Sequence, residues 1–508
     1  MEISKTHSKL NFIKGTLILA SCALALFFIY DYLAVFSLRP QSMHAWRQTD
    51  GASFALNYYL DNLKFFEPRL HSLDAEGGKT IAEFPLLYYL TAMLYKVFGI
   101  HEGIFRAVNF CFFLSGVFSL YAIAFLVTTD LWVSICIALF LFASPLQVYY
   151  AFNFLPDSTA MGFMLSGTVF LLLWHKKQVP WQLILSTFFF SIAGMIKIIT
   201  IYPLLAYAGC VFIFLFTDRT FLKRGVILFF FTAIVIAFSL IWLMWTKHYK
   251  EVHHSSYFLQ TIVPFALYNE HYNAHWYTVP GRLLRDFWWN FFPLATQVAL
   301  AFFLFHLYKF RNSFSKQHLL FISLLFALVI AIFLLFYFQF MHHDYYAVIL
   351  VPAAFSIFIA GAYAIIKSRN MKLIQYAKLI LVVALLFSIA SARMEVHQRY
   401  SNTAKLTGFP SDFFTITPYL RSIGVNQNAL MLSPDDLSPN GTLYMMDNRG
   451  FSGYYLSNTA SRYDSAVAKG ARYLVCWKKE TLSNPLIKQL SPDSIGTYGV
   501  IGVYRLSN

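Results

Sequence analysis

The chain has 508 residues, of which 58% are hydrophobic, 19% are aromatic and only 12% are charged, and its formal net charge at pH 7 is +15. A soluble globular protein carries about 25% charged residues, so this composition excludes a water-soluble enzyme. The high apolar content also excludes a disordered chain. Repeated apolar runs of about 20 residues, long enough to cross the hydrocarbon core of a bilayer, predict a polytopic α-helical membrane protein.

The first apolar run follows a basic N-terminal segment and extends from Gly15 to Phe36. It is longer than the core of a typical signal peptide and no small-residue cleavage site follows it, so we expect a retained first span. Ten further runs bring the prediction to about 11 transmembrane helices. The predicted spans are 15–36, 106–127, 131–150, 158–174, 181–196, 199–216, 225–246, 291–308, 318–340, 345–366 and 373–391.

The apolar run 84–99 is interpreted differently, as a juxtamembrane helix on the outer face. It is short and rich in tyrosine, and it begins with Glu83 and Pro85. If this run does not cross the membrane, all later basic loops lie on the side of the N-terminus, as the positive-inside rule expects of the cytoplasm. These loops contain Lys176, Lys177, Arg219, Lys223, Arg224, Lys309, Arg311, Lys316, Lys367, Arg369, Lys372 and Lys378. The net positive charge is then an orientation signal, and nucleic-acid binding is not expected.

This topology places the C-terminus and four irregular loops on the outer side. The loops are 37–105, 151–157, 247–290 and 341–344, and they belong to a predicted membrane domain over residues 1–394. A predicted extracytoplasmic α/β domain follows over residues 395–508, where Pro, Gly, Asn and Asp become frequent. Because polar and charged residues gather in the outer loops, we expect function on that face.

The predicted C-terminal domain contains several short elements. We expect helices at 418–424 and 461–469, and strands at 429–433, 472–477 and 498–506. Neither GxGxxG nor GxxxxGK[ST] occurs there, so nucleotide binding has no support from the sequence. Asn440-Gly-Thr442 matches a glycosylation sequon, a pattern that arises readily by chance.

Candidate site residues begin in the first outer loop, which reads His44-Ala-Trp-Arg-Gln-Thr-Asp50 and is followed by Glu83 and then Arg106. Burial and nearby charge can tune the pKa of a carboxylate such as Asp50, and Arg47 and Gln48 flank it. The alternative is an interfacial anchor, with Trp46 and Arg47 at the level of the lipid headgroups.

Three later signals lie on the same predicted face. Asp157, in Asn153-Phe-Leu-Pro-Asp157-Ser158, either caps the next helix or faces a cavity. Lys197 has apolar neighbours, and a lysine at membrane depth usually pairs, faces a cavity or extends to the interface. In Met341-His-His-Asp-Tyr-Tyr346, the two adjacent histidines with Asp344 could bind a metal ion, or the turn, with His343 and Tyr345, could hydrogen-bond to a phosphate or sugar. A divalent metal ion stays an open alternative, with Asp50, Asp157 and His343 as its candidate ligands.

The order of these motifs resembles the GT-C superfamily of bacterial membrane glycosyltransferases, in particular the group related to protein O-mannosyltransferases and the lipid A aminoarabinose transferase. The resemblance covers roughly residues 15–366. It rests on HAWRQTD (44–50), FFEPRL (65–70), EFPLLYYLTAMLYKVFG (83–99), Arg106, SPLQVYYAFNFLPDS (144–158) and IK (196–197). The combination is specific, although each motif alone is weak.

This resemblance implies transfer of a sugar from a polyprenyl-phosphate carrier to an acceptor at the outer face of a bacterial inner membrane. Asp50 matches the acidic catalytic residue, although many relatives have Asp-Glu where this chain has Asp50-Gly51. Glu83 and Asp157 match further acids of the family, and Lys197 matches a lysine thought to meet the carrier phosphate. His343 and Tyr345 match a basic residue and a tyrosine in the related turn.

The chemistry of such a transfer fits the same residues. Loss of a lipid phosphate from an anomeric carbon builds negative charge, which Arg106, Lys197 and His343 could stabilise. Asp50 could accept the acceptor's proton as a general base, in a single displacement that inverts the anomeric carbon. The expected partners are a polyprenyl-phosphate-linked sugar, membrane lipids and a glycolipid, polysaccharide or protein acceptor. The main alternative, a lipid transporter or flippase, predicts ionisable residues in both halves and often an internal repeat, and neither is found.

Overall fold

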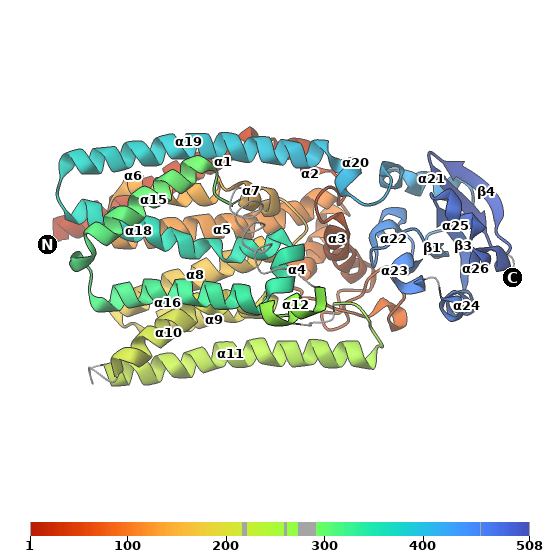
Figure 1. Ribbon diagram of the computed structural model, residues 1–508, viewed down its shortest axis with the longest axis horizontal. Helices are drawn as coiled ribbons and strands as arrows, with labels where there is room; N and C mark the ends of the chain where they lie inside the picture. Colours follow the sequence, from red (N-terminus) through yellow and green to blue (C-terminus); the bar gives the residue numbers. More distant parts are fainter. Residues whose placement is uncertain (1, 216–220, 259–261, 273–290, 458, 507–508) are drawn as a thin grey trace.

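The computed structural model describes residues 2–215, 221–258, 262–272, 291–457 and 459–506. Long helices form an elongated bundle, and a small sheet surrounded by short helices lies at one end of it (Figure 1). Part of the predicted outer loop 247–290, namely 259–261 and 273–290, lies outside the described residues.

Eight of the described helices, counted with any short 3-10 segment that continues them, are long and apolar enough to cross a membrane, or nine if one bent pair is a single span. The eight contain α1 (Glu2–Ile29), α5 (Glu102–Thr128), α8 (Asp157–Lys177), η2 (Ile198–Ile201) with α10 (Tyr202–Leu215), α11 (Phe221–Val252), α16 (Lys316–Leu335), η5 (Asp344–Ile349) with α18 (Val351–Lys367), and α19 (Met371–Ser401). The bent pair is α6 (Leu131–Leu141) and α7 (Pro145–Ala151). The chain is therefore a multi-pass membrane protein.

The remaining two of the eleven predicted spans form shorter apolar helices. These are α9 (Pro180–Ile196), with 17 residues, and α15 (Leu294–Lys309), with 16 residues. The run 84–99, predicted as a juxtamembrane helix, forms the 13-residue α4 (Leu86–Phe98), which is too short to span a bilayer. The other helical segments are α2 (Tyr32–Phe36), α3 (Ala45–Leu60), η1 (Glu76–Gly78), α12 (Phe265–Tyr272), η4 (Arg311–Ser313) and α17 (Tyr337–His342).

The bend between α6 and α7 shapes the bundle around the site. The two helices differ in direction by 71°, and Pro145 begins α7 at the helix position that tolerates proline. Backbone groups released by such a bend need partners inside a membrane protein. Tyr30 donates a hydrogen bond to the carbonyl of Phe142 at 2.7 Å, and Tyr32 donates to the carbonyl of Val148 at 2.6 Å. The bend is thus held by tyrosines from the first two helices.

The C-terminal end of the chain contains a five-stranded mixed sheet in the order β2-β1-β3-β5-β4. β1 (Leu430–Ser433), β2 (Gly450–Ser452) and β3 (Ala471–Cys476) are parallel, and the hairpin of β4 (Asp493–Tyr498) and β5 (Ile501–Arg505) adds antiparallel strands. The helices around it are α20 (Thr403–Leu406), η6 (Ser411–Phe414), α21 (Ile416–Ser422), α22 (Gly441–Met446), α23 (Gly453–Leu456), α24 (Ala460–Ala468), α25 (Lys479–Ser483) and α26 (Pro485–Gln489). The described residues from Ser411 onward are called the C-terminal unit below.

Three of these strands and two of these helices agree with the sequence analysis. The predicted strands correspond to β1, β3 and β5, and the predicted helices to α21 and α24. Gly424 (φ 85°) and Gly470 (φ 102°) follow the two helices in the left-handed conformation that glycine adopts readily. The sequence analysis did not predict β2, which has three residues, or β4, whose polar sequence resembles a loop.

The C-terminal unit shares a hydrophobic core with the start of the membrane domain. Phe54 of α3 and Leu87 of α4 are buried in the same cluster as Phe413 and Met445. Figure 1 shows α3 and α4 lying between the long helices and α22. Arg39 adds polar contacts at this junction, because its guanidinium donates to the carbonyls of Met445 (2.7 Å) and Tyr444 (3.1 Å).

Candidate active site

The helix α3 carries the first cluster of candidate residues. His44 precedes it with a left-handed backbone (φ 55°), which redirects the incoming loop into the helix. The side chain of Gln48 donates to the carbonyls of Gln41 (2.7 Å) and Met43 (2.8 Å). Gln48 therefore holds the beginning of α3 to the preceding loop, while Arg47 and Asp50, one turn apart, share another face.

Arg47 joins two of the predicted carboxylates. Its Nη1 lies 3.5 Å from Oδ2 of Asp50, and its Nη2 donates to Oε1 of Glu83. Glu83 arrives from the loop before α4, and its Oε2 accepts a hydrogen bond from Tyr88 at 3.1 Å. Asp50 is fully buried, and Arg47 and Glu83 are each about 7% exposed. The pairing therefore takes place in an environment that contains little water.

Lys197 connects Glu83 to the third predicted carboxylate. The ammonium lies 3.7 Å from Oε1 of Glu83 and 3.3 Å from Oδ1 of Asp157. Asp157 is the first residue of α8, and Lys197 lies at the break between α9 and η2. The structure thus brings five predicted residues into one buried set, called the charged network below. Its members are Arg47, Asp50, Glu83, Asp157 and Lys197.

The charged network contains three carboxyl groups but only two cations, so one carboxyl group lacks a full counter-charge. Burial raises the pKa of Asp50 to about 7, although the charge of Arg47 opposes this effect. Burial acts in the same sense on Glu83, but the charges of Arg47 and Lys197 hold the pKa of that carboxyl below its usual range. Asp50, rather than Glu83, is therefore poised to exchange a proton near neutral pH. Its Oδ1 accepts no hydrogen bond from any described residue.

A second cluster lies beside the charged network. The ring of Tyr345 lies 5.2 Å from the ring of His343 and 5.3 Å from the Lys197 ammonium. Burial and the neighbouring positive charges lower the pKa of His343 to about 3, so its imidazole is neutral at pH 7. A neutral imidazole binds a phosphate by hydrogen bonding rather than by charge. His343 Nδ1 has no hydrogen-bond partner among the described residues.

The second cluster contains functional candidates that sequence reasoning missed. Asp344 accepts hydrogen bonds from Tyr150 and from Arg399 (3.1 Å), and its other contact is His44 Nε2 at 3.1 Å. Arg399 also pairs with Glu395 at 2.8 Å, one turn earlier on α19. The only sequence signal for Arg399 was its Glu-x-x-x-Arg spacing from Glu395, beyond the last apolar run. This spacing is common at exposed helix ends, so it did not indicate a functional residue.

Arg106 does not join the charged network. Its guanidinium donates to the carbonyls of Phe152 (2.8 Å) and Leu38 (2.9 Å), and it stacks on the ring of Phe154 with 4.4 Å to the centroid. These contacts hold the loop that leads to Asp157. The structure places Arg106 as a support for this loop, whereas the sequence suggested contact with the substrate.

No group of three or more His, Cys, Asp or Glu side chains in the described ranges is arranged to hold a metal ion. Two of the three proposed metal ligands, Asp50 and Asp157, have Arg47 and Lys197 as their nearest opposite charges. The third, His343, contacts aromatic rings. Among the described residues, these three side chains are therefore not arranged with one another as a metal site.

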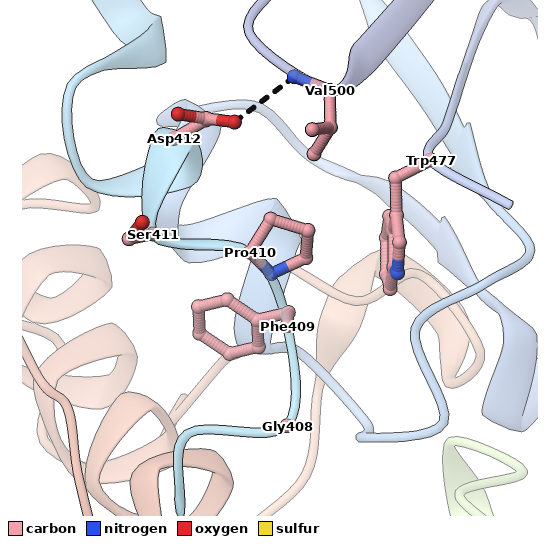
Figure 2. A pocket seen from close by; sticks show the side chains of 7 residues that line it. All are labelled: Gly408, Phe409, Pro410, Ser411, Asp412, Trp477 and Val500. Carbon is pink, nitrogen blue, oxygen red and sulfur yellow. Dashed lines mark hydrogen bonds between the residues drawn. The ribbon is translucent and has the colours of Figure 1, made fainter. Parts of the chain in front are cut away.

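A shallow cavity of about 530 Å³ lies on the C-terminal unit and includes no residue of the charged network. Figure 2 shows Trp477 and Pro410 on opposite sides of it, with Asp412 accepting a hydrogen bond from the backbone amide of Val500 at 3.0 Å. The lining residues are Gly408, Phe409, Pro410, Ser411, Asp412, Trp477 and Val500.

Comparisons with known proteins show the fold. No family model matches the chain, and no curated protein matches its sequence. Crystal structures of ArnT from Cupriavidus metallidurans, in the apo state and bound to undecaprenyl phosphate, match with TM-scores of 0.61 and 0.60 at 15% identity, over 96% of this chain and 97% of theirs. The apo oligosaccharyltransferase of Archaeoglobus fulgidus matches with a TM-score of 0.53 at 12% identity, over 96% of this chain and 74% of its own. The predicted fold, a polytopic helical membrane protein with a small C-terminal α/β part, is therefore confirmed as one that the chain shares with these structures.

Proposed function

We propose, on the premise of this fold, that the protein is a glycosyltransferase that moves a sugar from a polyprenyl-phosphate carrier to an acceptor. The observation that carries the proposal is the buried charged network, in which two cations share Oε1 of Glu83 and Asp50 keeps a carboxyl oxygen without a hydrogen bond from any described residue. ArnT, which shares the fold, binds undecaprenyl phosphate. A phosphate site next to a general base is what this transfer requires.

The two cations take the role of stabilising the leaving group. As the bond between the anomeric carbon and the phosphate oxygen breaks, its electron pair leaves with the carrier phosphate. Lys197 and Arg47 lie in a buried site, where opposite charges interact more strongly than in water. Glu83 remains ionised and contacts both cations through its Oε1, while Tyr345 and the neutral His343 supply hydrogen bonds beside Lys197.

Asp50 takes the role of general base. The hydroxyl or amine of the acceptor forms the new bond to the anomeric carbon and gives its proton to Oδ1 of Asp50. Attack from the face opposite the phosphate inverts the configuration of the sugar. A carboxylate with a pKa of about 7 suits this step, because a base is most effective when its pKa lies near the working pH.

The proposal includes a location and a range of acceptors. We place the charged network and the C-terminal unit on the periplasmic side of a bacterial inner membrane, because this orientation leaves the basic loops in the cytoplasm. A lipid-anchored donor reaches the site from the bilayer, so no nucleotide site is needed. The acceptor is a glycolipid, a polysaccharide or a protein.

Sugar transfer by the purified protein in lipid tests the proposal. A panel of labelled polyprenyl-phosphate sugars is incubated with a crude envelope acceptor, and both labelled product and free polyprenyl phosphate are measured. The Asp50→Asn variant should lose about 10²-fold to 10⁴-fold in rate, the usual contribution of a general base. The control is Asp464→Asn, which changes an exposed carboxylate of the C-terminal unit and should leave the rate unchanged.

Other outcomes contradict the proposal in different ways. Equal turnover by wild type and Asp50→Asn would remove Asp50 from the chemistry. If no donor is consumed while the protein binds the carrier and moves it across vesicles, the flippase alternative replaces the glycosyltransferase.

A further inference from the structure

The helix α3 has a second polar face that points away from the charged network. Thr49, Ser53 and Asn57 are spaced four residues apart, so they form a stripe along one side of the helix. All three are at most 1% exposed. Buried polar side chains need hydrogen-bond partners, and those of this stripe come from α3 itself, from His71 and from Asn440 and Arg449 of the C-terminal unit.

Asn440, which immediately precedes α22, makes the most direct of these contacts. Its Nδ2 donates to the carbonyl of Thr49 at 3.2 Å, one residue before Asp50. Its Oδ1 accepts from the hydroxyl of Ser53 at 3.4 Å and from the backbone amide of His71 at 3.1 Å. Both ends of the Asn440 amide are therefore engaged. The side chain is fully buried, so this sequon asparagine is inaccessible for glycosylation in the folded protein.

The rest of the stripe is held in the same way. Arg449, just before β2, donates to Oδ1 of Asn57 at 2.7 Å. Nδ1 of His71 lies 2.7 Å from Oγ of Ser53 and 3.2 Å from Nδ2 of Asn57. The C-terminal unit thus contacts α3 at both ends of the stripe, over two helical turns.

Hydrogen bonds within the C-terminal unit hold Asn440 itself in place. Asp436, which follows β1, accepts hydrogen bonds from the backbone amide and the hydroxyl of Thr442, each at 2.7 Å. In the same turn, the hydroxyl of Ser438 accepts a hydrogen bond from the backbone amide of Gly441 at 2.8 Å. The start of α22, and with it Asn440, is therefore held to the turn after β1, an inner strand of the sheet, and Thr442 also hydrogen-bonds to Ser433 of β1 at 2.8 Å.

From these contacts we infer that the C-terminal unit positions the catalytic helix, and that Asn440 is the positioning residue that sets where Asp50 lies. The inference rests on the proposed glycosyltransferase function. Without the Asn440 amide, the carbonyl of Thr49 loses its contact with the C-terminal unit, and His71 and Ser53 keep only their hydrogen bonds to each other, so α3 can shift. A displacement of about 1 Å in a catalytic group can cost on the order of 10²-fold in rate.

The test compares Asn440→Ala with Asn428→Ala, which removes an exposed asparagine from the same unit. Sugar transfer is measured for both, with kcat and KM determined for the labelled polyprenyl-phosphate donor over a range of pH. Asn440→Ala should lower kcat at least about tenfold while the donor KM stays nearly constant. Its pH–rate midpoint should also move, because the separation of Asp50 from Arg47 changes. Hydrogen exchange in residues 45–60 should become faster.

Each remaining outcome is decisive. If folded Asn440→Ala matches Asn428→Ala in kcat and in pH profile, the inference is overturned while the proposed function stands. If Asn440→Ala does not fold, sugar transfer is measured for Ser53→Ala instead. A lower kcat of this variant supports the inference, and an unchanged kcat overturns it. If wild type shows no turnover that depends on Asp50, the proposed function fails and the inference fails with it.

Discussion

At the scale of single residues, the main feature is a buried aspartic acid whose counter-charge is shared. Arg47 contacts both Asp50 and Glu83, and its contact with Glu83 is the closer of the two. Glu83 has Lys197 and Tyr88 as further partners, so it is the better stabilised anion. The unequal environments separate the pKa values of the two carboxyl groups, as is common where one carboxyl group holds charge and another transfers a proton.

This separation predicts the pH dependence of the reaction. Burial raises the pKa of Asp50 to about 7, and only the deprotonated form can accept the acceptor's proton. We therefore expect kcat/KM to rise about tenfold per pH unit below pH 7 and to level off above it. The measurement is a pH–rate profile of the purified protein in lipid, with carrier binding followed in parallel. A profile that is flat between about pH 5 and about pH 8 would contradict the role given to Asp50.

At the scale of the secondary-structure elements, the close approach of α3 to the loop before α8 restricts which residue can occupy position 51, next to Asp50. A Cβ atom at Gly51 would lie 2.4 Å from the carbonyl oxygen of Phe154 and 3.4 Å from the ring of Tyr88. This leaves no space for a side chain at residue 51. The close packing explains why a second adjacent carboxylate, expected from the family resemblance, is absent in this chain.

The same packing makes Gly51→Ala a test of how precisely α3 must lie. Alanine favours an isolated helix by about 1 kcal/mol over glycine, so propensity alone predicts a gain in stability. The clash with a backbone carbonyl should instead lower the melting temperature and push α3 away from Asp157, with a loss of at least about tenfold in turnover. The control is Gly209→Ala on α10, where the added Cβ meets only one side-chain atom at 3.5 Å. Equal stability and turnover in the two variants would show that α3 tolerates a shift.

At the scale of the whole molecule, the site is assembled from segments that lie far apart in the sequence. Asp50, Asp157 and Lys197 come from three different helices or helix breaks, and in the second cluster Asp344 joins Arg399 of α19 to His44, which precedes α3, each at 3.1 Å. The C-terminal unit then completes the surroundings of α3. A shared hydrophobic core, rather than a flexible linker, holds this unit against the membrane domain.

The orientation of the whole molecule is testable by cysteine labelling. The five natural cysteines are replaced, and a single cysteine is introduced at Asp464 in the C-terminal unit or at Lys177 at the end of α8, both exposed. The positive-inside rule predicts that a membrane-impermeant maleimide labels Asp464→Cys in intact spheroplasts, and Lys177→Cys only after permeabilisation. The reverse pattern would place the charged network on the cytoplasmic side and contradict the proposed location.

The sequence by itself determined the membrane class, the positions of the apolar helices and the residue types of the charged network. Hydrophobic runs and basic loops are local properties of a chain, because the bilayer imposes the same requirement on every span. That the run 84–99 forms a short helix rather than a full span followed from its length and its flanking Glu83 and Pro85. Asp50, Glu83, Asp157 and Lys197 were recognisable because charged residues next to apolar runs are costly and seldom lack a partner.

Only the tertiary structure decided which of these residues meet. Pairing depends on how the helices pack, which no local pattern encodes, so the sequence could not show that Arg106 contacts loop carbonyls outside the charged network, and its contact with the substrate stays a prediction. Arg399 and Asn440 were missed for the same reason, since their partners lie 55 and 391 residues away along the chain. A side chain's role in this protein depends on the element packed against it. The packing of the shared hydrophobic core, rather than the neighbouring sequence, determines which element that is.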